Sequence, residues 1–395
     1  MKTHNKPLSL LLTAILLTAM LTFAGGDVYA GGATVNTAEK FYTVLGDSTV
    51  HTITVSGDFE INQTVIIDRQ LTINGNGKIT LHSSSLYVPD FGNVTLAGDV
   101  KIEGGSGMGL VRVYGAGIFT MKDRASLTAD NTAIIVESEL PCYVYIYGGS
   151  IHAKRGDGIQ AFYKKSNVTV TGGTISGYGA ALSLEDGSIG TITGGSFRSI
   201  GDDYKSAGVF LTNKSKVTIS GKTYIGGRKS IFMNRSDVNI VSSPDLKITG
   251  EVKASVMNTY PVERKAFFNT LQQPLSVKAG SRNSFSIKGY DAGITYTLSN
   301  PSAALNASIA DNTVTFSPQK AGEYDLKLTS VFNDSTLSLT IPVTVSANGS
   351  NAGDERPSIP ETGALPVLPM LVFFGFAVFV AVGTIGYKAY AKRSR

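Results

Sequence analysis

The nine residues Val168–Ser176, Val-Thr-Val-Thr-Gly-Gly-Thr-Ile-Ser, return almost unchanged as Gly190–Arg198, Gly-Thr-Ile-Thr-Gly-Gly-Ser-Phe-Arg. Related stretches, in which alternating apolar and polar residues lead into a turn, begin at seven further positions: Ile53, Leu71, Val94, Phe119, Val144, Val217 and Val238. Successive copies begin 18 to 27 residues apart. A period of this size indicates stacked structural repeats, each packing on its neighbours along the chain.

Each repeat carries two kinds of local signal. Runs such as Val168–Val170 alternate with period two, which predicts a strand with one buried face. The glycines that follow, Gly172 and Gly173 in this copy, permit the positive φ of a sharp corner. A second short apolar run recurs in the repeats, as in Ala180–Leu184, and no repeat contains a ten-residue helical pattern. The sequence therefore predicts an all-β fold, a single-stranded parallel β-helix of about nine coils over residues 31–250. A β-sandwich of short strands is the alternative.

The two ends of such a solenoid need covering, because an open coil exposes apolar side chains and unpaired backbone. We expect Gly31–Lys40 to be an irregular lead-in and Phe41–Ile67 to close the first coil. Residues 251–273 are a joint or an end cap, and the sequence leaves both possibilities open.

A different kind of pattern follows the repeats. From about Pro274 the period is lost and about seven short alternating runs begin, which predicts a small immunoglobulin-like (Ig-like) β-sandwich over residues 274–347. The Gly-x-Tyr of Gly322–Tyr324 resembles the bacterial Ig-like and cadherin-like modules of surface proteins. Since those modules usually act as spacers, we expect the same role here. Residues 348–358 are rich in Asn, Gly, Ser and Pro, which indicates a flexible linker.

The two termini carry targeting signals. Residues 1–30 have the basic start, the apolar centre Leu8–Phe23 and the small-residue cleavage site of a secretion signal, with cleavage expected between Ala30 and Gly31. Near the other end stands the pentapeptide Ile359-Pro360-Glu361-Thr362-Gly363. Residues 364–387 then contain no charge and are long enough for a transmembrane helix, and the basic tail 388–395 favours a cytoplasmic C-terminus.

In this order, the four signals resemble the LPXTG-type sorting signal of Gram-positive cell-wall proteins. The resemblance implies that a sortase cysteine attacks the Thr362 carbonyl, releases Gly363 onward and passes the chain to an amine of a peptidoglycan precursor. Pro360 fixes an extended peptide that an enzyme groove can hold. Ile359 stands where the family most often has Leu, which leaves the sortase class open. The protein is then expected to be secreted, held transiently in the membrane and attached covalently to the cell wall; a plain membrane-anchored protein is the alternative.

The net charge of +5 comes from these targeting ends, and the chain between them holds equal numbers of basic and acidic residues. Nothing in this balance indicates a nucleic-acid partner. Cys142 is the only cysteine and alternates with apolar residues, so we expect it to point inward as an apolar filler. His51, His82 and His152 fall in different repeats, so the sequence supports neither a metal site nor a cofactor.

The predicted solenoid resembles the right-handed, pectate-lyase-like β-helix superfold, which includes polysaccharide lyases, glycosidases and non-catalytic adhesins. The catalytic candidates are charged residues that precede strands: Arg155, Asp157, Asp202, Asp203 and Lys205. The short motifs Gly156–Ile159 and Gly201–Asp203 resemble polygalacturonase signatures. They lie about two repeats apart, however, whereas that family would have them in adjacent coils. Stacking places the acids on one edge, on the order of 10 Å apart, near the carboxylate gap of inverting glycosidases. Solvated corner acids are the simpler interpretation.

A row of tyrosines is the candidate ligand surface. Tyr143, Tyr145 and Tyr147 alternate with apolar residues and therefore point outward, where aromatic rings can stack on sugars. The nearby aromatic residues Phe162, Tyr163, Tyr178 and Tyr204 extend the candidate set. Packing under a loop is the alternative role. We accordingly expect a non-catalytic adhesin that recognises glycans or host matrix; a wall-tethered polysaccharide lyase or glycoside hydrolase competes with it, and a purely structural wall component is a third possibility.

Overall fold

The computed structural model describes residues 31–105, 109–203, 205–255, 264–268, 271–299 and 303–348. Strands make up most of this part, with one α-helix and one 3-10 helix. No helix in these ranges is long and apolar enough to cross a membrane. The predicted secretion signal, sorting pentapeptide, membrane span and basic tail lie outside the described residues.

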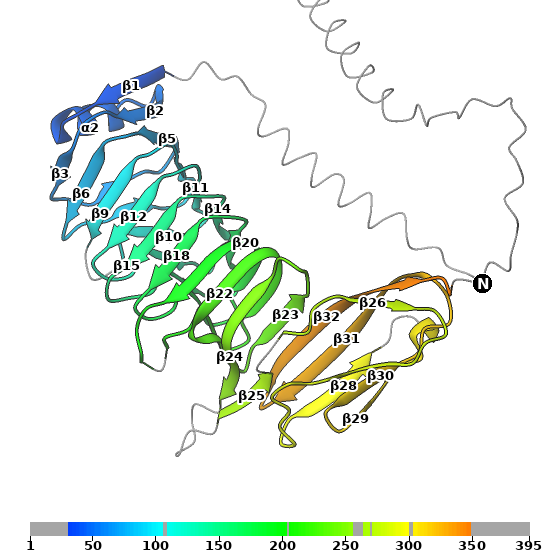
Figure 1. The fold of residues 1–395 in the computed structure, drawn as a ribbon. Coiled ribbons are helices and arrows are strands. Elements are labelled where there is room, and N and C mark those ends of the chain that lie inside the picture. Colours follow the sequence, from blue (N-terminus) through cyan, green and yellow to red (C-terminus); the bar gives the residue numbers. More distant parts are fainter. Residues whose placement is uncertain are drawn as a thin grey trace, which may run out of the picture. The chain divides into compact units, whose positions relative to one another are not determined.

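The repeats form a parallel β-solenoid of about nine coils, as predicted, in which each coil adds one strand to each of three ladders (Figure 1). The first ladder contains β1 (Gly31–Val35), β2 (Val50–Val55), β5 (Gln70–Gly75), β8 (Asn93–Leu96), β11 (Ile118–Met121), β14 (Cys142–Ile146), β17 (Ser166–Val170), the start of β20 (Ile189–Ser199), the start of β22 (Lys216–Asn234) and β23 (Asp237–Val241). We number the coils from one to nine by their first-ladder strands, beginning with β2 and ending with β23.

The second and third ladders are built in the same way. The second contains β3 (Phe59–Ile61), β6 (Lys78–His82), β9 (Lys101–Gly105), β12 (Ser126–Ala129), β15 (Ser150–Ala153), β18 (Thr174–Gly177), the end of β20, the middle of β22 and the start of β24 (Lys247–Ser255). The third contains β4 (Val65–Ile66), β7 (Leu86–Val88), β10 (Val111–Tyr114), β13 (Ile134–Glu137), β16 (Ile159–Phe162), β19 (Leu182–Leu184), β21 (Val209–Thr212) and the ends of β22 and β24. The sequence indicated two strands in each coil, but the structure has three. The nine-residue motif contributes to two of them, one before and one after its Gly-Gly corner, as β17 and β18 show.

Inward side chains of one coil lie over those of the next. One column of the first ladder is formed in register by Ile53, Ile73, Leu96, Met121, Ile146, Val170, Ile192, Ile219 and Ile240, all at most 1% exposed. Each such side chain contributes about 1.5–3 kcal/mol by leaving water. Cys142 is buried in the same ladder, and burial raises the pKa of its thiol to about 12, so it stays protonated and fills space as expected.

The start of the solenoid differs from the prediction of an irregular lead-in. Gly31–Val35 forms β1, which pairs in parallel with β2, and an eight-residue helix, α2 (Ala38–Leu45), follows. The Thr37 side chain caps this helix by accepting a hydrogen bond from the Lys40 N–H (3.3 Å). Phe41 is fully buried against Phe59, with 5.7 Å between ring centroids. A helix of two turns is too short to show a clear period, so the sequence pattern missed the element that covers the first coil.

Seven strands follow the solenoid, the number expected for residues 274–347: β26 (Leu275–Lys278), β27 (Asn283–Ser286), β28 (Thr295–Ser299), β29 (Ser308–Ala310), β30 (Thr313–Phe316), β31 (Gly322–Phe332) and β32 (Ser335–Ser346), with the 3-10 helix η1 (Ala303–Leu305) between β28 and β29. β31 and β32 form an antiparallel hairpin, with β28 on β31 and β26 on β32. β27, β30 and β29 form a separate three-stranded sheet. The Ig-like assignment of this segment remains a prediction.

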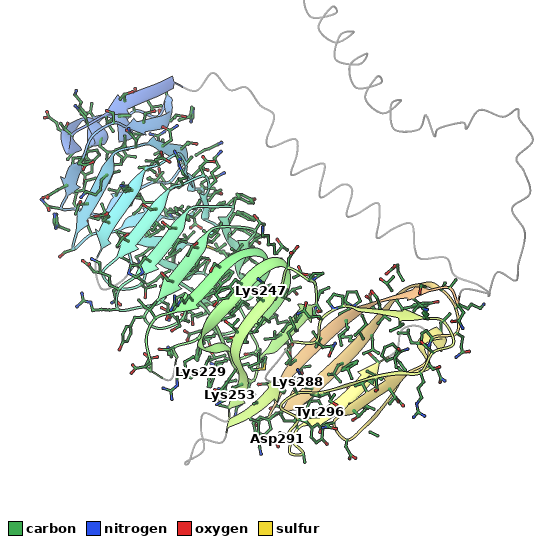
Figure 2. The ribbon with its side chains drawn as sticks, in the orientation of Figure 1. Lys229, Lys247, Lys253, Lys288, Asp291 and Tyr296 are labelled. Atoms are coloured by element: carbon green, nitrogen blue, oxygen red, sulfur yellow. The ribbon has the colours of Figure 1, made fainter. Side chains whose placement is uncertain are left out.

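The segment between the solenoid and these strands is held by a short antiparallel pair. The end of β24 pairs with β25 (Arg264–Phe268). β25 is tied onward, because the Tyr296 hydroxyl donates to the Phe267 carbonyl (3.1 Å) and Lys265 Nζ lies 3.3 Å from Asp291 Oδ2. Figure 2 labels Asp291 and Tyr296 in this region. In addition, β32 pairs in parallel with β23 and so extends the first ladder beyond coil nine.

Candidate functional site

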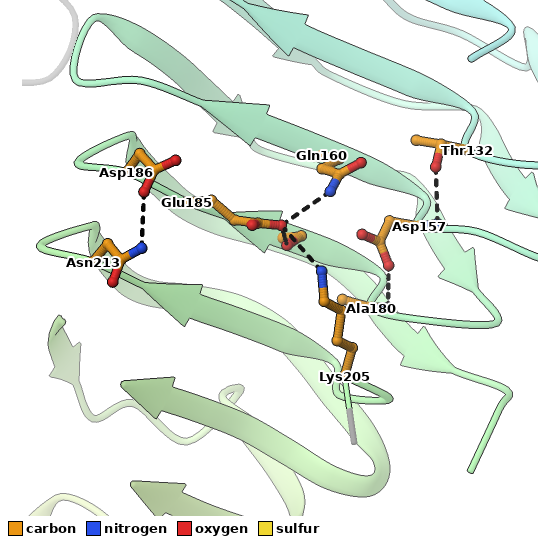
Figure 3. A network of polar contacts seen from close by, with 9 residues as sticks. Thr132, Asp157, Gln160, Ala180, Glu185, Asp186, Lys205 and Asn213 are labelled. Atoms are coloured by element: carbon orange, nitrogen blue, oxygen red, sulfur yellow. Dashed lines mark hydrogen bonds and ion pairs between the residues drawn. The ribbon is translucent and has the colours of Figure 1, made fainter. Parts of the chain in front are cut away.

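The fold places the predicted catalytic acid Asp157 in a structural position (Figure 3). Its side chain is buried at the corner before β16, only 6% exposed, so the interpretation as a solvated corner acid is wrong for this residue. One carboxylate oxygen accepts a hydrogen bond from the Ala180 N–H (2.6 Å), and the Asp157 N–H donates to Thr132 Oγ1 (3.3 Å). These three residues occupy equivalent corners of three successive coils. Asp157 therefore ties the coils together through the backbone.

Its surroundings shift its proton equilibrium. Burial raises the pKa of Asp157 to about 6, and the nearby carboxylates of Glu185 and Asp203 act in the same direction. The Ala180 N–H and the Lys205 ammonium oppose the rise. The carboxyl group consequently changes its charge at mildly acidic pH.

A second acid, Glu185, completes this polar cluster and was missed at the sequence level. Glu185 Oε1 accepts hydrogen bonds from Gln160 Nε2 (3.0 Å) and Ser183 Oγ (2.9 Å), and lies 3.7 Å from Lys205 Nζ (Figure 3). Lys205 Nζ also lies 5.7 Å from the ring centroid of the buried Phe210. Gln160 and Ser183 are register partners on adjacent strands of the third ladder, and Glu185 follows Ser183 by two residues. This alignment of polar residues is the sequence signal that could have located Glu185.

The other catalytic candidates make bonds within their own or the preceding coil. Arg155 Nε donates to the Asp130 carbonyl (3.0 Å), and Asp203 Oδ1 accepts from Ser206 Oγ (2.8 Å). Asp202 is exposed. The structure thus brings Glu185, Asp203 and Lys205 near Asp157, whereas Arg155 turns to a neighbouring corner. Within the described ranges, no group of three or more His, Cys, Asp or Glu side chains is placed to hold a metal ion.

The outer face of β14 carries the predicted tyrosine row, and the outward direction of its side chains is confirmed. The rings of Tyr143, Tyr145 and Tyr147 are nearly parallel, with 6.1 Å between successive centroids and interplanar angles of 3° and 4°. Tyr147 is 52% exposed and the other two are half-buried. Thr120 of β11 and Thr169 of β17 flank Tyr145 across the ladder. Burial raises the pKa of Tyr145, so its phenol stays a neutral hydroxyl that can donate and accept hydrogen bonds.

The remaining aromatic candidates lie elsewhere. Phe162 ends β16 in the third ladder, and Tyr163 follows it at a corner with a φ of 70°. Tyr178, 41% exposed, stands at the corner between the second and third ladders. Tyr204 lies outside the described residues. The six aromatic candidates that the structure describes, the three of the tyrosine row included, thus occupy three places instead of one surface.

Comparison with known families adds one finding. Residues 32–138 match the family model of a putative pectate lyase-like adhesive domain. The matched segment runs from β1 to β13 and ends before the tyrosine row and before the acids Asp157 and Glu185. No curated protein matches the chain. The match agrees with the parallel solenoid and fits an adhesin-like surface protein.

Proposed function

We propose that this chain is an adhesin that is secreted, attached to a Gram-positive cell wall and used to hold glycans or host-matrix proteins without turning them over. The similarity of residues 32–138 to an adhesive domain supports the general class. The proposal assigns display to the C-terminal part, with residues 274–347 as an Ig-like spacer, residues 348–358 as a linker and Ile359–Gly363 as the sortase motif.

The observation that carries the binding role is the parallel stack Tyr143–Tyr145–Tyr147 on the outer face of β14. Aromatic rings of this kind contact the apolar faces of sugar rings, while phenol hydroxyls take the sugar hydroxyls at the rim. The strand fixes the rings in place, so little side-chain entropy is lost on binding. A regular solenoid can carry such a row because outward residues do not enter its core.

Non-catalytic binding is favoured by the position of the acids. The Asp157 carboxylate accepts the Ala180 N–H, and Glu185 is held by Gln160 and Ser183. Both acids therefore have structural partners that account for their presence.

Tyr145→Ala is expected to weaken glycan or matrix binding by roughly five- to tenfold, the loss of one aromatic contact. Affinity is measured with the full chain on a glycan array and on immobilised matrix proteins. Thr120→Ala is the matched control, since Thr120 lies next to Tyr145 on the adjacent strand and its replacement should have little effect.

Release of reducing sugars or unsaturated products from pectins, alginate or glycosaminoglycans, abolished by Asp157→Ala or Asp203→Ala, would instead establish the lyase or hydrolase. A chain that shows neither binding nor turnover would be a structural wall component.

Thr362→Ala tests the anchoring. In a Gram-positive host the variant should lose most of its covalent wall attachment and accumulate in the membrane fraction, because sortase forms its acyl bond at the Thr362 carbonyl. The measurement is the amount of protein that enzymatic wall digestion releases. Glu361→Gln, at the variable position of the motif, serves as control and should remain wall-bound. Undiminished attachment of the Thr362 variant would rule out this route.

A further inference from the structure

A groove of about 590 Å³ lies at the corner between the first and second ladders, in coils six to nine. Its floor is formed by the two Gly-Gly corners of the repeated motif: Gly172, Gly173, Gly194 and Gly195. The groove begins next to the tyrosine row, because Gly172 packs directly on the Tyr147 carbonyl of coil five. Nothing in the proposed adhesin function yet accounts for it.

Coil stacking explains why the floor has no side chains. A Cβ on Gly194 would lie 2.2 Å from the Thr171 carbonyl oxygen, and one on Gly172 would lie 2.5 Å from the Tyr147 carbonyl oxygen. Gly195 has a φ of 95°, which strongly favours glycine. Two successive corners are therefore bare backbone, and a ligand can approach the main chain closely.

Two lysines stand over this floor. Lys222 is in register with Gly194, one coil beyond the glycine corners, and Lys247 lies one coil further, beside Tyr224. Both lysines are exposed, and neither makes an ion pair with any residue in the described part of the chain. Figure 2 labels Lys247 near β22. Asp245 is the one acid among the residues that line the groove, so the lining carries a net positive charge.

A tyrosine forms one side of the groove. Tyr224 is 38% exposed, and its hydroxyl accepts a hydrogen bond from Thr249 Oγ1 (3.1 Å). Its ring lies over Gly226 of the same strand, where an added Cβ would come within 2.7 Å of the ring carbons. Ser196 and Lys247 are its neighbours in register on the two sides. The hydrogen bond from Thr249 and the close packing on Gly226 thus hold the ring in place.

We propose that this groove binds an acidic oligosaccharide, with a carboxylate or sulfate between Lys222 and Lys247 and a sugar ring against Tyr224. A fixed aromatic ring together with hydroxyl groups suits a sugar, and the two unpaired ammonium groups select for a negative charge on it. The volume falls in the ~300–1,000 Å³ range of ligand sites. Four coils at ~4.8 Å per coil extend over roughly 15 Å, enough for more than one sugar ring. The inference rests on the proposed adhesin function and narrows its ligand class.

The test measures the affinity of the full chain, purified in detergent, for three probes by calorimetry: hyaluronan oligosaccharides with carboxylates, heparin oligosaccharides with sulfates, and neutral dextran oligosaccharides. Replacing Lys222 and Lys247 together by Gln should weaken binding of the acidic probe roughly tenfold or more and flatten its salt dependence. Asp245→Asn should strengthen it a few-fold by removing a repelling charge. Lys101→Gln is the matched control. Lys101 is exposed and lies in the same outward-facing column of the second ladder as Lys247, but in coil three, away from the groove.

The outcomes separate the two proposals. Preference for an acidic probe that falls in the double lysine variant and not in Lys101→Gln supports the groove, and the better acidic probe identifies the anionic group. Equal binding of dextran, or acidic binding that survives loss of both lysines but not Tyr145→Ala, overturns the groove and leaves the adhesin standing. Absence of binding to every glycan and matrix probe overturns both.

Discussion

Gly194→Ala is expected to lower the free energy of unfolding by about 3 kcal/mol, the upper part of the range for forced overpacking. The added methyl group would lie 2.2 Å from the Thr171 carbonyl oxygen of the preceding coil, while Gly194 itself stacks in register with Lys222 of the following coil. Relief requires separating two coils, which also weakens the hydrogen bonds beside the corner. Urea unfolding followed by circular dichroism measures the loss.

Gly46→Ala is the control for this change. Gly46 ends α2 with a φ of −71°, and an added Cβ would come no closer than 3.6 Å to another heavy atom. The same methyl group should therefore alter stability by less than about 1 kcal/mol there. Equal losses at Gly46 and Gly194 would show that close stacking does not determine the glycine at the corner.

Asp157→Asn is expected to change the pH dependence of stability by about 2 kcal/mol between pH 7 and pH 4. Burial raises the pKa of Asp157 to about 6 in the folded protein, against an ordinary value of 3.8, and each unit is worth about 1.4 kcal/mol. The folded state therefore binds the proton more tightly than the unfolded state. The stabilisation is complete below the ordinary pKa and is lost as the pH rises through 6. Asparagine keeps an acceptor for the Ala180 N–H but does not titrate.

The measurement compares urea unfolding of the wild type and the Asn variant at both pH values. The wild type should gain about 2 kcal/mol relative to the variant on going from pH 7 to pH 4. Asp202→Asn serves as control, because Asp202 is exposed and its replacement should leave the profile parallel to that of the wild type. A parallel profile for Asp157→Asn as well would mean that the carboxyl group has similar pKa values in the folded and unfolded states.

The fold was predictable where a short local sequence pattern is enough to determine the strand or the turn. Alternation in Val168–Val170 and the Gly-Gly corner after it were enough to predict stacked strands, and the same alternation predicted that Tyr145 points outward. The third strand of each coil escaped detection because the strand Thr174–Gly177 directly follows the corner and has little pattern of its own. The helix α2 escaped because it has only two turns.

The candidate sites depended on contacts that no local pattern contains. The Asp157 carboxylate accepts a hydrogen bond from Ala180 of the next coil. Glu185 likewise pairs with Lys205, which belongs to the coil after its own. The groove is a similar case. Its glycines are visible in the repeat, but the unpaired lysines above them come from coils eight and nine, and only the stacking register brings them together.

The parallel pairing of β32 with β23 has a consequence for association between copies of the molecule. If β23 were an exposed edge strand, it would offer its main-chain donors and acceptors to any extended peptide, including the same strand of a neighbouring molecule. Here the hairpin strand Ser335–Ser346 occupies that template from within the chain. The segment that we interpret as a spacer thus also covers a strand edge on which a second copy could otherwise pair.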